Sequence, residues 1–347
     1  HCAIALPEVS RVWCAGGEDR SMSAAESPFP TLADVAAAQG RIAGRVHRTP
    51  LSSATSLGAL LDPPVALYLK EEQRQKTGSF KVRGVLNRLQ TLDDAQRARG
   101  LVTVSAGNHA QAVSWAATAE GLRATVVMPT GAVPNKVAAS RAYGAVVDLY
   151  GDDGAQAFER AHTLERDAGL TFIHPYDHPM TVAGAGTIGA EILEDLDAPD
   201  VVIVPVGGGG LISGVALAVK ERRPKTRVIG VEPVGAQTVT QALAAGHPVT
   251  PSGMQTIADG LAAPFAGNLN LALIQRYVDE MVLVTDDELR QAMRLLLERA
   301  KLLAEPAGAA GLAALLAGTV AGTQGRRVVV VVSGGNADIA RLPALLA

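Results

Sequence analysis

Short apolar runs alternate along the chain with longer segments whose apolar residues recur at helical spacing. Short runs rich in valine, isoleucine and leucine are typical of strands that are buried on both faces. Strands that alternate with helices form βαβ units around a parallel sheet, so the pattern predicts an α/β fold. The predicted strands are Val65 to Leu69, Leu101 to Val104, Ala124 to Met128, Ala145 to Leu149, Val201 to Pro205, Val228 to Val231 and Val328 to Val332.

The same alternation divides the chain into two predicted domains. Residues 100–175 hold a compact series of strands and helices, with Thr171 to Ile173 as a candidate further strand. We interpret this series as a small domain inserted into a larger domain, which comprises residues 22–99 and 176–347. Each domain is expected to have a central, mostly parallel sheet flanked by helices.

Helix boundaries are predicted from spacing and from start and stop signals. A helix is expected from Thr31 until Pro50, because the residue before proline is biased away from helical angles. Leu51 to Leu61 is predicted to be loop and turn, and Thr285 begins a capping box before another helix. Other helices are expected around Ala110 to Ala119, Asn135 to Tyr143, Ala155 to Ala168, Thr187 to Leu196, Leu211 to Lys220 and Ala236 to Ala245.

Composition narrows the class of protein. The 347 residues are 48% apolar and 19% charged, which is typical of a soluble globular protein with room for two cores. A net charge of -3 without a basic block disfavours nucleic acid as a partner, and the apolar runs are too short to span a bilayer. The absence of cysteine beyond Cys2 and Cys14 fits a reducing compartment, so we expect a cytoplasmic protein.

The first residues do not resemble a secretion signal, because no long apolar core follows a basic segment. The sequence begins at His1 rather than at methionine. We expect residues 1–21 to be a tag or an upstream-translated extension that is poorly ordered, with Met22 as the natural start.

Lys81 lies between Phe80 and Val82 at the start of a predicted helix, where it could be an ordinary solvated charge. Downstream, Gly207, Gly208, Gly209 and Gly210 separate a buried strand from a helix. Such a turn allows backbone N–H groups to close around a phosphate at a helix N-terminus. A turn without a ligand and a dinucleotide loop are the alternatives, although the run lacks a clean Gly-x-Gly-x-x-Gly and a distinctive acidic residue about 20 positions on.

Two further polar loops follow predicted strands. Ser105-Ala106-Gly107-Asn108-His109 follows one strand, and Ser333 stands at the end of the last one. Asn108 could contact a hydroxyl group on the ring of a bound ligand, and Ser105 with nearby N–H groups could hold a ligand carboxylate. His109 is interpreted as mainly structural. Because ligands of open α/β sheets bind at the carboxyl ends of strands, these loops and Lys81 together predict a pyridoxal phosphate site.

With these pieces in order, the sequence resembles the fold-type II pyridoxal phosphate enzymes, specifically threonine/serine dehydratase and serine racemase, over about residues 30 to 340. The resemblance implies that Lys81 forms the Schiff base, that Phe80 lies beside the ring and that Asn108 contacts the ring hydroxyl. It also implies a homodimer or homotetramer. The remaining cofactor contacts that it implies are the N–H groups of Gly207, Gly208, Gly209 and Gly210, the hydroxyl of Ser333, and the pocket residues Gly260 and Glu305.

Two departures from the family pattern refine this expectation. Serine racemases carry a second serine where this chain has Ala106, and a methyl group cannot move a proton, so efficient racemisation is not expected. The family's metal site matches at Glu232 and at the carbonyl of Ala236, but Thr238 stands where a third ligand is a carboxylate. A monovalent cation or a weakly bound divalent cation is therefore expected there.

The sequence thus predicts a lyase that removes ammonia from L-threonine or L-serine, in threonine catabolism or isoleucine biosynthesis. Its substrate-binding residues would be Ser105, Ala106, Gly107, Asn108 and His109, and Lys81 would be the catalytic residue. Two alternatives stay open: a 3-hydroxyaspartate dehydratase or an amino-acid racemase on the same site, and a non-enzymatic module that binds a nucleotide or pyridoxal phosphate.

Overall fold

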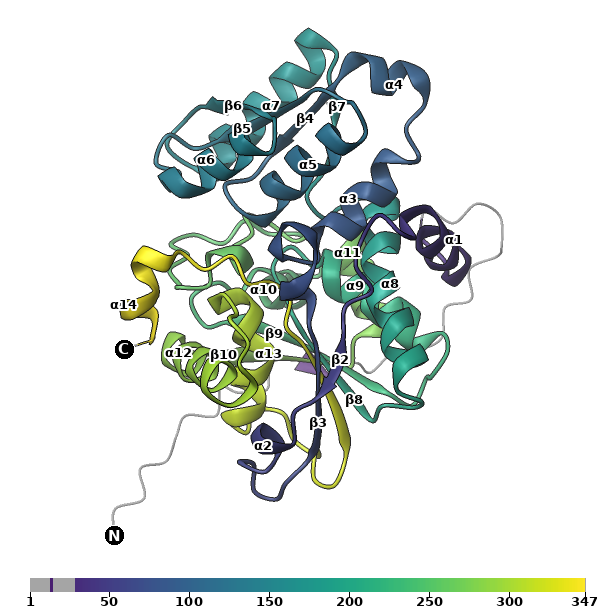
Figure 1. Ribbon diagram of the computed structural model, residues 1–347, viewed down its shortest axis with the longest axis vertical. Helices are drawn as coiled ribbons and strands as arrows, with labels where there is room; N and C mark the ends of the chain where they lie inside the picture. Colours follow the sequence, from purple (N-terminus) through teal and green to yellow (C-terminus); the bar gives the residue numbers. More distant parts are fainter. Residues whose placement is uncertain (1–12, 15–28, 347) are drawn as a thin grey trace.

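The computed structural model describes residues 13–14 and 29–346, and these form two sheets in two lobes (Figure 1). The smaller sheet has four parallel strands in the order β6-β5-β4-β7, and all four lie between Leu101 and Phe172. Its strands are β4 (Leu101–Val104), β5 (Ala124–Met128), β6 (Val146–Leu149) and β7 (Thr171–Phe172). The four strands of this sheet lie where the sequence predicts them, while the domain boundaries at residues 100 and 175 stay a prediction.

The larger sheet has seven strands in the order β1-β10-β9-β8-β11-β3-β2. Only the edge strands β1 and β2 pair antiparallel, whereas the five inner strands are parallel. The strands are β1 (Trp13–Cys14), β2 (Leu51–Ser53), β3 (Ala66–Lys70), β8 (Val201–Pro205), β9 (Arg227–Pro233), β10 (Glu280–Val284) and β11 (Arg327–Val331).

Helices cover both faces of the larger sheet, because its inner strands have apolar side chains on both sides. In β11, Val328 and Val330 belong to one core with α12 (Asp286–Leu295) and α13 (Pro306–Leu316). Val329 and Val331 belong to another core with α8 (Pro179–Asp195) and α9 (Gly210–Lys220). The helices are α1 (Leu32–Ile42), α2 (Thr55–Gly58), α3 (Lys81–Leu89), α4 (Asp94–Arg99), α5 (Asn108–Ala119), α6 (Pro134–Ala142), α7 (Gly154–Ala168), α8 (Pro179–Asp195), α9 (Gly210–Lys220), α10 (Thr238–Ala245), α11 (Asn268–Tyr277), α12 (Asp286–Leu295), α13 (Pro306–Leu316) and α14 (Leu342–Leu346). None of the described helices is long and apolar enough to cross a membrane.

Helix α3 lies where the two lobes meet (Figure 1). Its apolar face, with Val82, Val85, Leu86 and Leu89, packs into the core of the smaller sheet together with α5. The opposite side of α3 meets α8 of the larger lobe, where a Cβ on Gly84 would lie 2.8 Å from the carbonyl oxygen of Thr181. The start of α3, which carries Lys81, is therefore held by both lobes.

The largest differences from the predicted boundaries are in three places. Helix α1 begins at its Thr31 cap as expected but ends at Ile42, because Gly44 adopts a positive φ of 72°. The segment from Leu51 to Leu61 contains β2 and α2 rather than loop alone. Helix α8 starts at Pro179, one of the residues that helices favour in their first turn, rather than at Thr187.

The predicted N-terminal extension lies almost wholly outside the described residues. The exception is Trp13–Cys14, which pairs antiparallel with Glu280 and Met281 of β10. The sequence did not predict β10, although Glu280–Val284 is fully buried.

Candidate active site

A cavity of about 290 Å³ opens at the carboxyl ends of β4, β8 and β11, between the two lobes. Parallel strands bring the loops that follow them to one edge of a sheet, which explains why segments far apart in the sequence meet there. All the residues predicted for cofactor and substrate line this cavity: Phe80, Lys81, Ser105, Ala106, Gly107, Asn108, His109, Gly207, Gly208, Gly209, Gly210, Gly260, Glu305 and Ser333. The structure brings them together, while their individual roles stay predictions.

Lys81 is the first residue of α3, and its side chain lines the cavity. Its Nζ lies 3.1 Å from the carbonyl oxygen of Pro175 and 5.2 Å from the centre of the Phe80 ring. Burial lowers the pKa of the Lys81 amine to about 8, because the charged form loses its hydration. A substantial fraction of this amine is therefore uncharged and nucleophilic near neutral pH.

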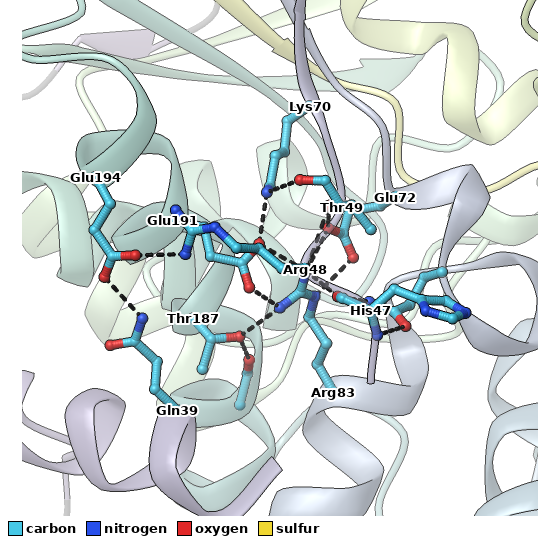
Figure 2. A network of polar contacts seen from close by, with 12 residues as sticks. Gln39, His47, Arg48, Thr49, Lys70, Glu72, Arg83, Thr187, Glu191 and Glu194 are labelled. Atoms are coloured by element: carbon cyan, nitrogen blue, oxygen red, sulfur yellow. Dashed lines mark hydrogen bonds and ion pairs between the residues drawn. The ribbon is translucent and has the colours of Figure 1, made fainter. Parts of the chain in front are cut away.

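A buried ion network anchors the helix that carries Lys81 (Figure 2). Arg83, on α3, is fully buried and donates to Glu72 over 2.8 Å and to Glu191 of α8 over 2.6 Å. Lys70, the last residue of β3, donates to Glu191 over 2.5 Å and to the carbonyl oxygen of Thr49 over 2.7 Å. Two cations thus face two carboxylates, so the network is neutral as a whole and ties α3 to β3 and α8.

Several helices that face the cavity begin without a side-chain cap, and two of them, α5 and α9, follow glycines. Helix α9 starts after Gly209, and α5 starts after Gly107, and in both the cap residue offers no side-chain acceptor. By contrast, α1, α4 and α12 begin with complete capping boxes. The first N–H groups of α5 and α9 are therefore donors for anions in the cavity.

The tetraglycine turn has no room for side chains. Gly209 has a φ of +96°, which favours glycine, and a Cβ on Gly208 would lie 2.6 Å from the ring of Tyr176. A Cβ on Gly210 would lie 2.8 Å from the Cβ of the same tyrosine. Backbone, and not side chains, therefore lines this end of the cavity.

The amide of Asn108 is held from two sides. Its Nδ2 donates to Glu305 over 2.5 Å, and its Oδ1 accepts from Asn336 over 2.7 Å. Burial raises the pKa of the Glu305 carboxyl to about 7. Asn336, which also donates to the carbonyl oxygen of Thr77, is a positioning residue to which the sequence analysis gave no role, although it lies three residues after the predicted Ser333.

The remaining predicted residues, Ser105, His109 and Ser333, make local contacts that shape the cavity wall. The hydroxyl of Ser105 accepts from the N–H of Gly107 over 3.1 Å, so it shapes the turn before α5. His109 is buried with its Nε2 2.9 Å from the hydroxyl of Thr103, and burial lowers the pKa of its imidazole well below the usual value. The carbonyl oxygen of Ser333 accepts from the N–H of Phe80 over 3.1 Å, which fixes the last strand beside Lys81.

The structure also places unpredicted residues on the cavity wall. Tyr176 and Phe158 contribute rings, and Lys136 of α6 forms an ion pair across the cavity with Asp259. His174 packs edge-on against Tyr176, and burial lowers the pKa of His174 to about 3, so its ring is neutral. Asp259 directly precedes the predicted cofactor residue Gly260, whereas the positions of the other residues in the sequence carry no recognisable signal.

At the predicted metal site, the Glu232 side chain contacts backbone N–H groups. The carboxylate of Glu232 accepts from the N–H groups of Val239 and Thr240 over 2.7 and 2.9 Å, so it caps α10. Burial raises the pKa of Glu232 to about 7. Within residues 29–346 no group of three or more His, Cys, Asp or Glu residues could hold a metal ion. A cation at Glu232 and Ala236 stays a prediction.

The cavity fits the predicted cofactor, pyridoxal phosphate. A buried amine with a lowered pKa can condense with its aldehyde, and the uncapped start of α9 beside Gly208 can receive its phosphate. The ring would lie between these two points, where Phe80 and Asn108 line the wall and Ser333 marks the end of β11.

Comparison with known proteins agrees with this geometry. The family described as pyridoxal-phosphate dependent enzyme matches residues 42–334. An L-threonine ammonia-lyase from Thermotoga maritima is 44% identical over 309 residues, which are 89% of this chain and 76% of the relative. A phenylserine dehydratase from Ralstonia pickettii is 45% identical over 312 residues, which are 90% of this chain and 95% of the relative. The structure of maize serine racemase matches with a TM-score of 0.86 at 38% identity, over 91% of this chain and 96% of that chain.

Proposed function

This chain belongs to the family of pyridoxal-phosphate dependent enzymes, in its fold-type II branch, and we propose that it is an L-threonine ammonia-lyase. The reaction removes water and then ammonia from L-threonine and gives 2-oxobutanoate, while L-serine would give pyruvate. The observation that carries the proposal is the single cavity in which the Lys81 amine, the glycine turn and the Ser105–His109 loop meet. The 44% identity to a threonine ammonia-lyase supports the choice of substrate.

Each part of the chemistry has a residue that can perform it. Pyridoxal phosphate, when bound, supplies a conjugated ring that withdraws electrons from the amino-acid Cα. Lys81 would take the proton from Cα, because burial lowers the pKa of its amine to about 8 and its side chain lines the cavity. The N–H groups at the start of α5, next to Ser105 and Asn108, would hold the substrate carboxylate.

The direct test is to offer the purified holoenzyme L-threonine, L-serine and L-threo-3-hydroxyaspartate in parallel and to measure 2-oxo-acid formation. We expect 2-oxobutanoate from threonine. No 2-oxo acid from threonine or serine, with the visible absorbance of the bound cofactor intact, would contradict the proposal.

The wall of the cavity disfavours hydroxyaspartate. A second substrate carboxylate would need a free cation, but Lys136 is already paired with Asp259. The neighbouring wall residues Leu261, Ala262 and Ala263 are apolar. L-phenylserine is a second candidate substrate, favoured by this apolar wall and by the 45% identity to a phenylserine dehydratase.

Ala106 predicts that the enzyme preserves the configuration of unreacted substrate. A methyl group cannot deliver a proton to Cα from the side opposite Lys81. We expect L-serine recovered from a partial reaction to contain almost no D-serine, and Ala106→Ser to raise the D-serine fraction, as measured by chiral chromatography. Equal D-serine formation by the two proteins would show that this position does not control the stereochemistry.

The lowered pKa of Lys81 predicts how the cofactor-free protein responds to pH. Because burial disfavours the charged form, the fraction of free amine should rise as the pH passes through about 8. We expect the initial rate of pyridoxal phosphate uptake, measured by visible absorbance, to rise through about pH 8 and to level off above it. A rate that still climbs steeply at about pH 10, the range of an ordinary lysine, would contradict the prediction. The Lys81→Ala protein is the control, since it should show no such absorbance.

The cytoplasm as the location and a homodimer or homotetramer as the assembly belong to the same proposal. They are supported by the scarcity of cysteine and by the family resemblance, respectively. Size-exclusion chromatography with light scattering tests the assembly.

A further inference from the structure

An apolar wall with an aromatic ring faces the part of the cavity that the cofactor and the substrate carboxylate leave free. The glycine turn takes the phosphate end, Lys81 stands at the reacting carbon, and the start of α5 takes the carboxylate in the function proposed above. The side chain of the substrate must therefore point toward the remaining wall. That wall is lined by Pro129, Gly154, Phe158, Leu261, Ala262, Ala263 and Pro264.

Phe158 is the centre of an aromatic cluster in a chain that is poor in aromatic residues. Only 3% of the residues are aromatic, and the chain has five phenylalanines. Phe158 lines the cavity, and its ring centre lies 5.3 Å from that of Phe265 and 6.3 Å from that of Phe172. Its ring is also 6.0 Å from that of His174, which is neutral. These tilted contacts from both lobes fix the Phe158 ring as a rigid apolar surface.

The position one helical turn before this ring carries no side chain. Gly154 is one helical turn before Phe158 on α7, so the two residues share a face of the helix. Both line the cavity, and a Cβ built on Gly154 meets no atom within 4 Å. Pro264, which precedes Phe265, lines the same cavity from the larger lobe.

The charged groups near this space are already satisfied. Lys136 and Asp259 pair with one another, and Glu305 accepts from Asn108. The hydroxyl of Tyr176 donates to the carbonyl oxygen of Phe265 over 3.0 Å. An apolar substituent would therefore lose no hydrogen bond there and would bury its surface, which favours binding.

We propose that Gly154, Phe158 and Pro264 form a subsite for an aromatic ring on the substrate Cβ, so that 3-aryl-3-hydroxy-2-amino acids react at least as efficiently as L-threonine. The inference rests on the proposed function, because the chemistry is the same. The C–H bond at Cα and the C–O bond at Cβ break, water leaves, and one water molecule then hydrolyses the released imine. L-threo-phenylserine gives phenylpyruvate and ammonia in this way, without an oxidant or reductant.

The test compares L-threo-phenylserine with L-threonine in the wild-type holoenzyme and in Gly154→Leu. A leucine side chain at this position would stand on the same helix face as Phe158 and narrow the cavity there. We therefore expect kcat/KM for phenylserine to fall about 10- to 100-fold, a range typical of steric discrimination in a pocket. The value for threonine should fall less than the value for phenylserine, because a methyl group needs less of this space than a ring. Gly40→Leu is the matched control, because Gly40 also has nothing within 4 Å of a built Cβ but lies on α1, away from the cavity. This control variant should leave kcat/KM for both substrates unchanged.

A binding measurement separates the subsite from turnover. L-phenylalanine and L-2-aminobutyrate lack the β-hydroxyl leaving group, so their affinity can be measured from the change in cofactor absorbance. We expect wild type to bind L-phenylalanine at least as tightly as L-2-aminobutyrate, and both Gly154→Leu and Phe158→Ala to reduce this preference. Phe158→Ala also serves if Gly154→Leu does not fold.

The outcomes distinguish the two levels of the proposal. If neither threonine nor phenylserine reacts, the proposed function is wrong. If threonine reacts but phenylserine does not, or if Gly154→Leu lowers both substrates equally, the ammonia-lyase stands and the aromatic subsite is wrong.

Discussion

Replacing Lys81 by alanine is expected to abolish 2-oxo-acid formation while the fold is retained. The amine is the group placed to take the Cα proton, and positioned proton transfer is worth about 10²- to 10⁴-fold in rate, to which the loss of covalent cofactor attachment adds. The side chain makes one hydrogen bond, to the carbonyl oxygen of Pro175, so its removal should cost little stability. Rates with L-threonine and far-UV circular dichroism measure the two effects.

Lys225→Ala is a suitable control, because Lys225 is exposed between α9 and β9 and lies outside the cavity. This variant should keep wild-type rates and wild-type cofactor absorbance. A small primary amine added to Lys81→Ala should restore part of the rate if proton transfer is the missing function. Turnover above about 10% of wild type in Lys81→Ala without added amine would remove Lys81 from its proposed role.

The site could be predicted from the sequence largely because of the topology of parallel sheets. Ser105, Gly207 and Ser333 come directly after, or within two residues of, the ends of β4, β8 and β11, and each strand has a clear apolar pattern. Once those strands are known to be parallel, their following loops must lie near one another. A short local signal therefore sufficed to place residues that are more than a hundred positions apart.

The residues that surround this site could not be found in the same way. Lys70 and Glu191 form an ion pair although 121 positions separate them, and each is an ordinary charged residue in the sequence. Phe158 reaches Phe265 only because α7 of the smaller lobe faces the loop after Asp259–Leu261. Such pairings depend on how distant segments of the chain pack together. The periodicity of apolar residues within one segment does not predict that packing.

Arg83 belongs to this unpredicted set, and replacing it by methionine is expected to lower the free energy of unfolding by about 3 to 5 kcal/mol. Methionine retains the length and apolar stem of the side chain, but Glu72 and Glu191 would then face one cation, Lys70, in a fully buried site. Although burial alone would lower the pKa of Arg83, its two carboxylate partners raise it above the usual value, so the guanidinium is charged at every accessible pH. Urea unfolding of the holoenzyme at one fixed cofactor concentration measures the loss.

The double variant Arg83→Met, Glu72→Gln separates lost charge balance from lost packing. If the cost arises from an unpaired carboxylate, neutralising Glu72 should recover part of the stability, because Glu191 and Lys70 still pair over 2.5 Å. Arg326→Met is the matched control: Arg326 is 58% exposed in its pair with Asp200, so its loss should cost less than about 1 kcal/mol. Equal unfolding midpoints for Arg83→Met and Arg326→Met would mean that the buried network does not hold α3. A double variant less stable than Arg83→Met would instead assign the cost to the lost hydrogen bonds around Thr49, whose hydroxyl donates to Glu72.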